Sequence, residues 1–243
     1  SSPLMLLVRA DSGITSVDKL KNKQVMISGD TKEAASILAM LSSNGIFEKD
    51  IKVLSHSFNL DDLLYGKTDA MSSYLSNEPI RLNDRKIGYK VFHPKDYGFD
   101  FYSDILFTSS KFIKNNPVLT KKFYEATIKG WKYAFNNISE TSELIFDKYN
   151  TQNKSLLTYI KEGEVLKKLA YVNMNKKGFF NQLGFIHKDK LESMVDVYKV
   201  LGLAHKDLNV DEFIYEYNHP QTVDINLLME EIILIAVLLL LSL

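Results

Sequence analysis

The stretch QVMISGDTKEAASILAMLSSNGIFEKDIKVL, residues 24–54, carries the pattern that decides the fold. It begins with the short apolar run Gln24–Ile27, which predicts a strand. A helix with one apolar face follows from Thr31, and Gly45 is placed to end it as a C-terminal cap. The next apolar run, Ile51–Leu54, predicts a second strand. Two strands joined through a helix form a crossover connection, so we expect them to be parallel members of one sheet.

Short strands and helices alternate in the same way on both sides of this stretch. Residues Leu4–Arg9 predict a strand before it, and Ala70–Tyr74 and Tyr89–Phe92 predict two strands after it. A short helix is expected at Leu60–Tyr65, closed by Gly66. The first hundred residues therefore predict an α/β lobe whose largely parallel sheet is covered on both faces.

The pattern changes to helices after one further expected strand at Asp104–Thr108. Helices are expected at Ser109–Asn115, Leu119–Phe135, Ser139–Tyr149, Ser155–Ala170 and Lys188–Leu201. A single strand is too little for a sheet, so we expect this lobe to be incomplete, its missing strands lying upstream of Ser1. Residues 1–103 are then lobe II with hinge segments, and residues 104–219 are the mostly helical remainder of lobe I.

Both ends of the chain are expected to be cut from a longer protein. The chain begins Ser1-Ser2-Pro3 without an initiator Met, and it ends on Ile232–Leu243, which is apolar apart from Ser242. These 12 residues are shorter than the roughly 20 that span a membrane. A buried core helix is the alternative, but four consecutive leucines leave no amphipathic period. We expect residues 220–243 to start a truncated transmembrane helix that anchors an extracytoplasmic, periplasmic domain to the inner membrane.

The composition argues against several classes of protein. Of the 243 residues, 45% are hydrophobic and 25% charged, as in ordinary folded domains rather than disordered chains. Lys+Arg and Asp+Glu both number 30, and this zero net charge gives no footprint for nucleic acid. The chain has no cysteine, and its five histidines are not spaced as metal ligands. Because no nucleophile or phosphate-binding motif is present either, we expect no catalytic residue, no metal and no cofactor.

Binding chemistry is concentrated just after the strand that ends at Tyr74. Within five residues this segment offers an aromatic ring at Tyr74, an amide at Asn77 and a carboxylate at Glu78. Ligands of open α/β sheets bind at the carboxyl ends of the strands, so these three residues are candidate ligand-binding residues. The alternative is a simple helix start, with a capping side chain and Pro79 in the first turn.

Two further segments hold candidate ligand-binding residues. The first segment joins a strand to the following helix, and the second is dense in aromatic and acidic side chains. The candidates are Gly29, Asp30 and Thr31 in the first segment and Tyr97, Tyr102 and Asp104 in the second. Free backbone N–H groups at a helix start bind polar ligands, although capping alone explains the first segment equally well. Packing between two lobes is the alternative for the second.

Several short blocks of the chain, taken in order, carry a resemblance to a known family. They are Ser12-Gly13-Ile14, Leu20-Lys21, Asp69-Ala70-Met71, Asn77-Glu78-Pro79, Asp96-Tyr97-Gly98, Phe101-Tyr102-Ser103-Asp104, Gly130-Trp131-Lys132-Tyr133-Ala134 and Phe213-Ile214-Tyr215. Together they resemble the periplasmic substrate-binding proteins for sulfonates and thiamine-pyrimidine precursors. The later blocks are most similar to the extracytoplasmic sensor version of that family. The resemblance covers roughly residues 5–217.

The resemblance implies a type II periplasmic binding protein fold, with two lobes and a hinged cleft. It implies a ligand such as an aminopyrimidine or a sulfonate. In the sensor version the binding domain precedes a membrane helix and a cytoplasmic signalling module. The alternative is the substrate-binding component of an ABC transporter, whose partner is a permease. A related branch is a pyrimidine-synthesis enzyme with a cysteine-rich motif, and because this chain has no cysteine that activity is not carried over.

The implied ligands differ in the side chains that they need. A carboxylate such as Glu78 can read the donor edge of an aminopyrimidine, while Tyr74 or Tyr97 covers its flat face. A sulfonate needs backbone N–H groups and arginine. The arginines are Arg9, Arg81 and Arg85, and none lies in a candidate segment. We therefore expect a neutral or cationic heterocycle, bound by cleft closure in the input domain of a membrane-anchored sensor.

Overall fold

The computed structural model describes residues 1–28, 30, 32–171, 183–204 and 208–215. The chain divides into two compact units, Ser1–Asp211 and Glu212–Leu243, and only residues 212–215 of the second unit are described. Among the described residues no helix is long and apolar enough to cross a membrane. The predicted membrane segment at 220–243 lies outside the described residues.

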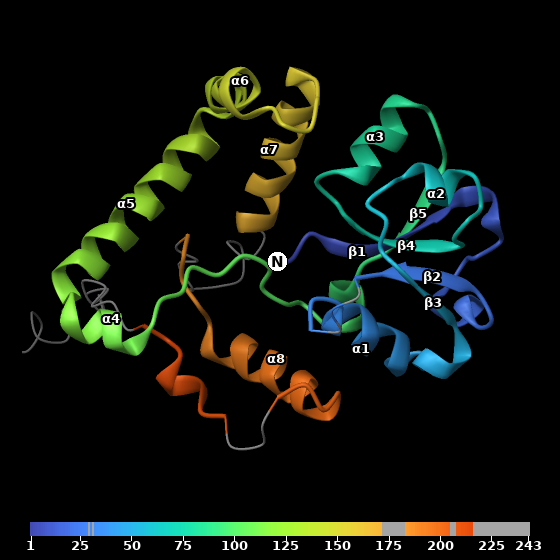
Figure 1. Cartoon of the computed structure of the whole chain (residues 1–243), viewed down its shortest axis with the longest axis horizontal. Helices are drawn as coiled ribbons and strands as arrows, with labels where there is room; N and C mark the ends of the chain where they lie inside the picture. Colours follow the sequence, from blue (N-terminus) through green and yellow to red (C-terminus); the bar gives the residue numbers. More distant parts are fainter. Residues whose placement is uncertain (29, 31, 172–182, 205–207, 216–243) are drawn as a thin grey trace, which may run out of the picture. The chain divides into compact units, whose positions relative to one another are not determined.

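The first unit contains one five-stranded sheet (Figure 1). Its strands are β1 (Leu4–Arg9), β2 (Gln24–Ile27), β3 (Lys52–Ser55), β4 (Ala70–Tyr74) and β5 (Tyr89–Phe92), in the spatial order β3-β2-β4-β1-β5. β2 runs parallel to β3 and β4, whereas β1 is antiparallel to β4 and β5. The sheet is thus mixed rather than largely parallel. The carboxyl ends of β2, β3, β4 and β5 all lie on the same side of the sheet, where these strands end. We call this side the carboxyl edge.

Both faces of the sheet are covered, as the sequence predicts. Along β1, the side chains of Leu6 and Val8 join one apolar core and those of Met5 and Leu7 join another. All four side chains are fully buried, because successive residues of a strand point to opposite faces. Helix α1 (Ala35–Ser43) covers the first core, and α2 (Asp61–Leu64) and α3 (Glu78–Asp84) cover the second (Figure 1).

The remaining elements are helical. They are α4 (Ser110–Asn115), α5 (Pro117–Asn136), α6 (Ile138–Tyr149), α7 (Leu156–Tyr171) and α8 (Lys188–Val200), with short 3-10 helices at Ala10–Ser12, Val17–Leu20, Glu48–Asp50, Pro94–Tyr97 and Val210–Glu212. The strand expected at Asp104–Thr108 is wrong: this segment is irregular. No strand in the described part of the chain lies beside it to accept its backbone hydrogen bonds, and a β ladder needs such a partner.

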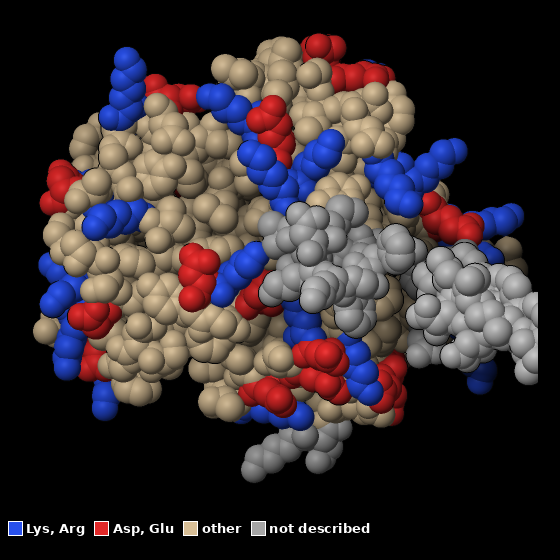
Figure 2. Space-filling model, turned by 180° about the vertical axis from the view of Figure 1, so that it is seen from behind, with Lys and Arg blue, Asp and Glu red and all other residues tan. Residues whose placement is uncertain are grey.

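Helix α5 leaves much of its apolar surface exposed. Val118, Leu119 and Phe123 are each more than half exposed, and Trp131 is close to half exposed. Trp131 contacts Phe135, with 5.3 Å between the ring centroids. On the face shown in Figure 2, acidic and basic side chains are interspersed without a large patch of one sign. This mixture agrees with the zero net charge of the sequence.

Candidate functional site

Three loops meet at the carboxyl edge of the sheet. Ser28 follows β2, His56 follows β3, and Tyr74 is the last residue of β4. These strands run in the same direction, so their carboxyl ends present side chains to one region. In open α/β sheets this is where ligands bind.

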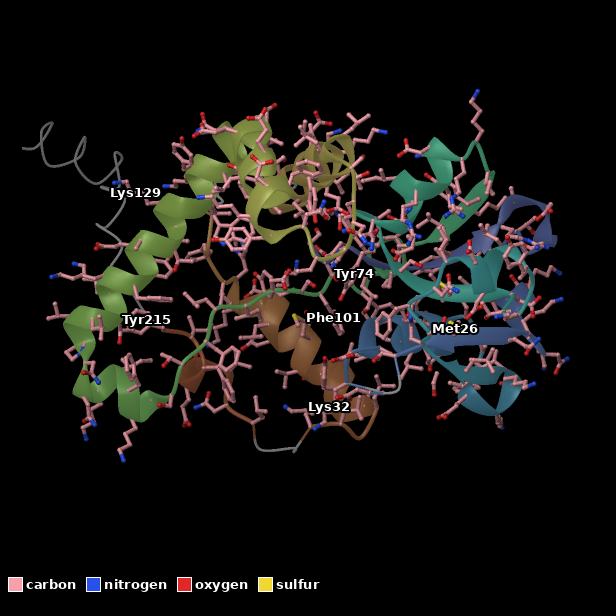
Figure 3. The ribbon with its side chains drawn as sticks, turned by 45° about the horizontal axis from the view of Figure 1, so that its top comes forward. Met26, Lys32, Tyr74, Phe101, Lys129 and Tyr215 are labelled. Atoms are coloured by element: carbon pink, nitrogen blue, oxygen red, sulfur yellow. The ribbon has the colours of Figure 1, made fainter. Side chains whose placement is uncertain are left out.

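Tyr74 is the centre of a group of carboxylates at this edge. Its backbone N–H donates a hydrogen bond to Oε2 of Glu78, at 2.9 Å. Partial burial raises the pKa of the Tyr74 hydroxyl, and the negative charges of Asp104, Glu33 and Glu78 raise it further. The charges of three carboxylates from three separate segments therefore act on a tyrosine that is 48% exposed. Figure 3 places Tyr74 at the end of the sheet.

Of the predicted residues, Tyr74 and Glu78 are joined by this hydrogen bond, and the charge of Asp104 acts on Tyr74. Glu33, which was not predicted, acts on Tyr74 in the same way. Glu33 is fixed by a hydrogen bond from the Ser28 hydroxyl to its Oε2, at 2.5 Å. This bond ties the turn before α1 to the residue after β2. A glutamate at a helix start is an ordinary dipole partner, so the sequence pattern alone gives no reason to select it.

Asn77 immediately precedes α3 and shows the helix-start geometry only in part. Pro79 occupies the first turn, as expected, but no side chain donates or accepts a capping hydrogen bond. The Oδ1 atom of Asn77 is buried and has no hydrogen-bond partner among the described residues. A buried acceptor without a donor is costly, so this amide is not explained by capping.

The loop after β2 is described only in part, because Gly29 and Thr31 lie outside the described residues. Asp30 is exposed, and its Oδ1 accepts a hydrogen bond from the N–H of Lys32 at 2.8 Å. This local turn is what the capping alternative predicts for Asp30. The role of these three residues in ligand binding stays a prediction.

Tyr102 lies in the segment that leaves the sheet region, where it packs against α8. Its hydroxyl accepts a hydrogen bond from the N–H of His187 at 2.9 Å, and the Lys190 ammonium lies 4.4 Å from its ring centroid. Lys190 also pairs with Asp100, with 3.0 Å between Nζ and Oδ2. The alternative of inter-segment packing describes Tyr102 better than an open ligand site does.

Helix α8 also reaches the loop after β2. The Tyr198 hydroxyl donates a hydrogen bond to the backbone oxygen of Lys32 at 2.7 Å. The Tyr198 ring stacks on Phe101, with 6.1 Å between the centroids (Figure 3 labels Phe101 and Lys32). The Tyr198 side chain of α8 therefore links Phe101 to the loop after β2.

Tyr97 is surrounded by different groups. It is partly buried and packs against the apolar core under α1. Burial raises the pKa of its hydroxyl, with smaller contributions from Asp96 and Asp18. The carboxylates near Tyr74 are not among the charges that act on Tyr97.

The loop after β3 lies at the same edge and contains His56 and Phe58, which the sequence did not predict as site residues. The His56 Nε2 donates to the backbone oxygen of Ser72 at 2.7 Å, and its Nδ1 accepts from the N–H of Phe58 at 2.9 Å. The two partners fix the tautomer, because a carbonyl needs a donor and an N–H needs an acceptor. The only sequence signal was a polar loop with a single aromatic residue after a strand.

A separate cavity of about 320 Å³ lies at the opposite edge of the sheet. It is lined by Arg9, Ala10, Asp11, Leu64, Ile87 and Gly88. The Arg9 guanidinium is already bonded to the backbone oxygen of Leu64 and to Asp11. The cavity therefore offers a ligand few unpaired polar groups, and it lies away from the strand ends that bind ligands in such sheets. We place the candidate site at the carboxyl edge.

The carboxylate side chains at the carboxyl edge are suited to accept hydrogen bonds from a donor. Among the described residues no group of three or more His, Asp or Glu side chains is arranged to hold a metal ion. The carboxylates near Tyr74 accept hydrogen bonds and favour a donor-rich or cationic ligand.

Comparison with known proteins identifies similar chains. The family model described as "NMT1/THI5 like" matches residues 1–141. The riboflavin-binding protein RibY of Chloroflexus aurantiacus is 25% identical over 144 residues, which are 58% of this chain and 41% of that protein.

Solved structures share the fold at low sequence identity. The sulfonate-binding protein SsuA from Methylobacillus flagellatus aligns with a TM-score of 0.57 and 17% identity, covering 88% of this chain and 63% of that one. The alkanesulfonate-binding protein SsuA from Xanthomonas axonopodis, bound to MOPS, aligns with a TM-score of 0.61 and 10% identity, covering 88% and 70%. The fold is therefore that of the two-lobed periplasmic binding proteins, as the sequence predicts. This chain spans less than two thirds of the RibY and Methylobacillus proteins.

Proposed function

This chain belongs to the NMT1/THI5-like family, and from that premise we propose that it binds a small organic ligand at the carboxyl edge of its sheet, outside the cytoplasm. The similarity to RibY and to the SsuA proteins supports this proposal, since RibY is a riboflavin-binding protein and the two SsuA proteins are sulfonate-binding proteins. The binding residues we propose are those gathered at the edge: Tyr74, Asn77, Glu78 and Asp104, together with Glu33.

The observation that carries the proposal is the group of carboxylates around Tyr74. Asp104, Glu33 and Glu78 all act on its hydroxyl, and one oxygen of Glu78 is already used by the Tyr74 N–H. Carboxylate oxygens are hydrogen-bond acceptors with negative charge, so this edge favours a ligand that brings hydrogen-bond donors or positive charge.

The preferred ligand is therefore a donor-rich, neutral or cationic heterocycle, of which an aminopyrimidine resembling a thiamine precursor is the example we favour. A sulfonate is disfavoured by the same carboxylates. It is also disfavoured by the arginines: Arg9 is bonded at the opposite edge, and Arg85 is paired with Asp61 at 3.0 Å. The sulfonate-binding neighbours, at 17% and 10% identity, support the fold rather than the ligand.

We propose that the domain acts by binding, as the input domain of a membrane-anchored sensor. The substrate-binding component of an ABC transporter, with a permease as partner, is the second candidate. Membrane attachment rests on the predicted segment at 220–243 alone. The fold alone does not decide between binding and catalysis. A pyrimidine-synthesis activity is not proposed, because the related enzymes use a cysteine-rich motif and this chain has no cysteine.

A thermal-unfolding screen tests the proposal. The panel holds 4-aminopyrimidine, thiamine, riboflavin, MOPS and free amino acids. A ligand at 100 times its Kd stabilises the folded chain by about 2.7 kcal/mol, which is a shift of several degrees. We expect the amine-bearing or planar heterocycles to raise the unfolding temperature and MOPS to leave it unchanged. A folded chain that responds to no compound would contradict small-molecule binding, and a response to MOPS alone would contradict the ligand class.

A further inference from the structure

Phe58 combines two unfavourable features at the carboxyl edge. Its φ of 57° puts a bulky residue in the left-handed region, where the Cβ atom of an L-residue crowds the backbone. Its side chain is 85% exposed, so the ring gains little from burial. The other non-glycine residues described with positive φ are Asn22, Asn153 and Lys86. Asparagine tolerates this conformation, and Lys86 follows the end of α3, so Phe58 is the unusual member.

The strained conformation is held by specific contacts rather than by chance. His56 accepts a hydrogen bond from the Phe58 N–H at 2.9 Å and is itself bonded to Ser72 of β4 at 2.7 Å. The His56 and Phe58 rings lie 4.5 Å apart at an angle of 39°. The loop is tied down further by Ser57, whose N–H lies 3.4 Å from the sulfur of Met26. Three strands, β2, β3 and β4, thus contribute to fixing one exposed ring.

A single exposed apolar side chain is common and indicates nothing by itself. Phe47 is such a case: it is 52% exposed in the segment before β3, and thus at the opposite edge of the sheet. What distinguishes Phe58 is that backbone strain and a histidine scaffold present the ring. Strain of this kind persists where the surroundings enforce it, and it concentrates at functional sites.

Phe58 and Tyr74 reach the carboxyl edge from strands that flank β2. Neighbouring strands are about 4.8 Å apart, so the ends of β3 and β4 are separated by about 10 Å. A planar ligand of one to three rings that contacts the carboxylates near Tyr74 has a dimension comparable with that gap. An exposed aromatic face supplies the complementary surface, since ring stacking needs a flat apolar partner.

We propose that Phe58 is a ligand-binding residue whose ring, presented by His56, stacks on a planar aromatic ring of the ligand. The inference rests on the proposed function and narrows the ligand to a planar ring compound. Phe58 supplies contact with the face of the ring, while the carboxylates near Tyr74 supply acceptors for its edge.

The test compares three variants by calorimetric titration. Phe58→Leu keeps an apolar side chain but removes the flat face, and Phe58→Asn removes the ring while suiting the left-handed backbone. Phe47→Leu is the matched control. The planar probes are riboflavin, thiamine and 4-aminopyrimidine, and MOPS is the non-planar probe. We expect both Phe58 variants to weaken binding of the planar probes about two- to tenfold, the size of one stacking contact. The control is expected to bind them as the wild type does.

The unfolding temperature of the ligand-free variants distinguishes a ligand-binding role of Phe58 from a structural one, because only a structural role predicts a lower temperature. Phe58→Asn is expected to unfold at the same temperature as the wild type or higher, because it relieves strain and loses little burial. A lowered unfolding temperature would overturn the inference by showing that the ring stabilises the fold. Unchanged affinity of Phe58→Leu for a planar probe would overturn this inference alone. A wild type that binds only MOPS would overturn it together with the proposed ligand class. A wild type that binds no probe would overturn it together with the proposed function.

Discussion

Replacing Glu78 by glutamine separates the charge of this side chain from its structural hydrogen bond. Oε2 of Glu78 accepts the Tyr74 N–H at 2.9 Å, and the amide oxygen of glutamine can accept the same bond. The fold is therefore expected to be retained. The ligand loses one charged acceptor, because an amide is neutral at every pH of interest.

The expected loss of affinity follows from the strength of the bond that is changed. A hydrogen bond to a charged group contributes about 1.5–3 kcal/mol, and one between neutral groups about 0.5–1.5 kcal/mol. The difference of roughly 1–1.5 kcal/mol corresponds to about a tenfold increase in Kd. Glu78→Ala removes the acceptor as well, so we expect it to bind still more weakly and to lower the free energy of unfolding by up to about 1 kcal/mol.

Calorimetric titration with 4-aminopyrimidine or thiamine, whichever binds, measures the first effect, and urea unfolding measures the second. Glu48→Gln is the matched control, because Glu48 lies in the 3-10 helix before β3, at the opposite edge of the sheet. The reasoning is refuted if Glu78→Gln binds as tightly as the wild type, or if Glu48→Gln weakens binding to the same degree.

Three further predictions concern the contacts around the site. Tyr198→Phe removes the hydroxyl that donates to Lys32, so urea unfolding should show a loss of about 0.5–1.5 kcal/mol; an unchanged midpoint would mean that this link between α8 and the β2 loop contributes nothing. Burial alone would raise the pKa of Asp100, but its pairing with Lys190, together with Ser1 and the N-terminal ammonium, outweighs burial and holds the pKa below its ordinary value. Stability from this carboxylate is then present above the unfolded-state pKa near 3.9 and is lost as the pH falls through the lower folded-state pKa, so Asp100→Asn should flatten the acid limb of the stability profile measured by urea unfolding. In an ultraviolet titration, the Tyr74 hydroxyl should ionise above its ordinary pKa, as should those of Tyr97, Tyr102, Tyr133 and Tyr198. The Tyr74→Phe variant should therefore show a late step smaller by one tyrosine; loss of amplitude from an early step instead would contradict the carboxylate charges that act on Tyr74.

The strands could be predicted closely because they are short apolar runs between turn residues. Gln24–Ile27, Ala70–Tyr74 and Tyr89–Phe92 are confirmed at both ends. The direction of β1 could not be predicted in the same way. Leu4–Arg9 is apolar and buried on both faces, which is typical of a parallel strand, yet it pairs antiparallel with both neighbours. Apolar pattern reports burial, not chain direction.

The candidate site could be predicted only where one segment carries several polar side chains. Tyr74 and Glu78 were found because they are four residues apart after a strand. Glu33 and Phe58 were not found, because what marks them is made by the fold. Glu33 reaches Tyr74 across 41 residues of sequence, and the His56 that holds Phe58 is bonded to Ser72, 16 residues away. A positive φ at Phe58 leaves no trace in residue type.

The most direct test of a ligand site at the carboxyl edge is to map where a ligand binds by amide NMR. The isotope-labelled chain is titrated with the compound that gives the largest thermal shift. The account predicts that perturbed amides concentrate at Ser28, Phe58 and Tyr74, with those of Arg9 and Gly88 unchanged. Perturbations centred instead on Arg9 and Gly88, which line the cavity at the opposite edge, would contradict the account.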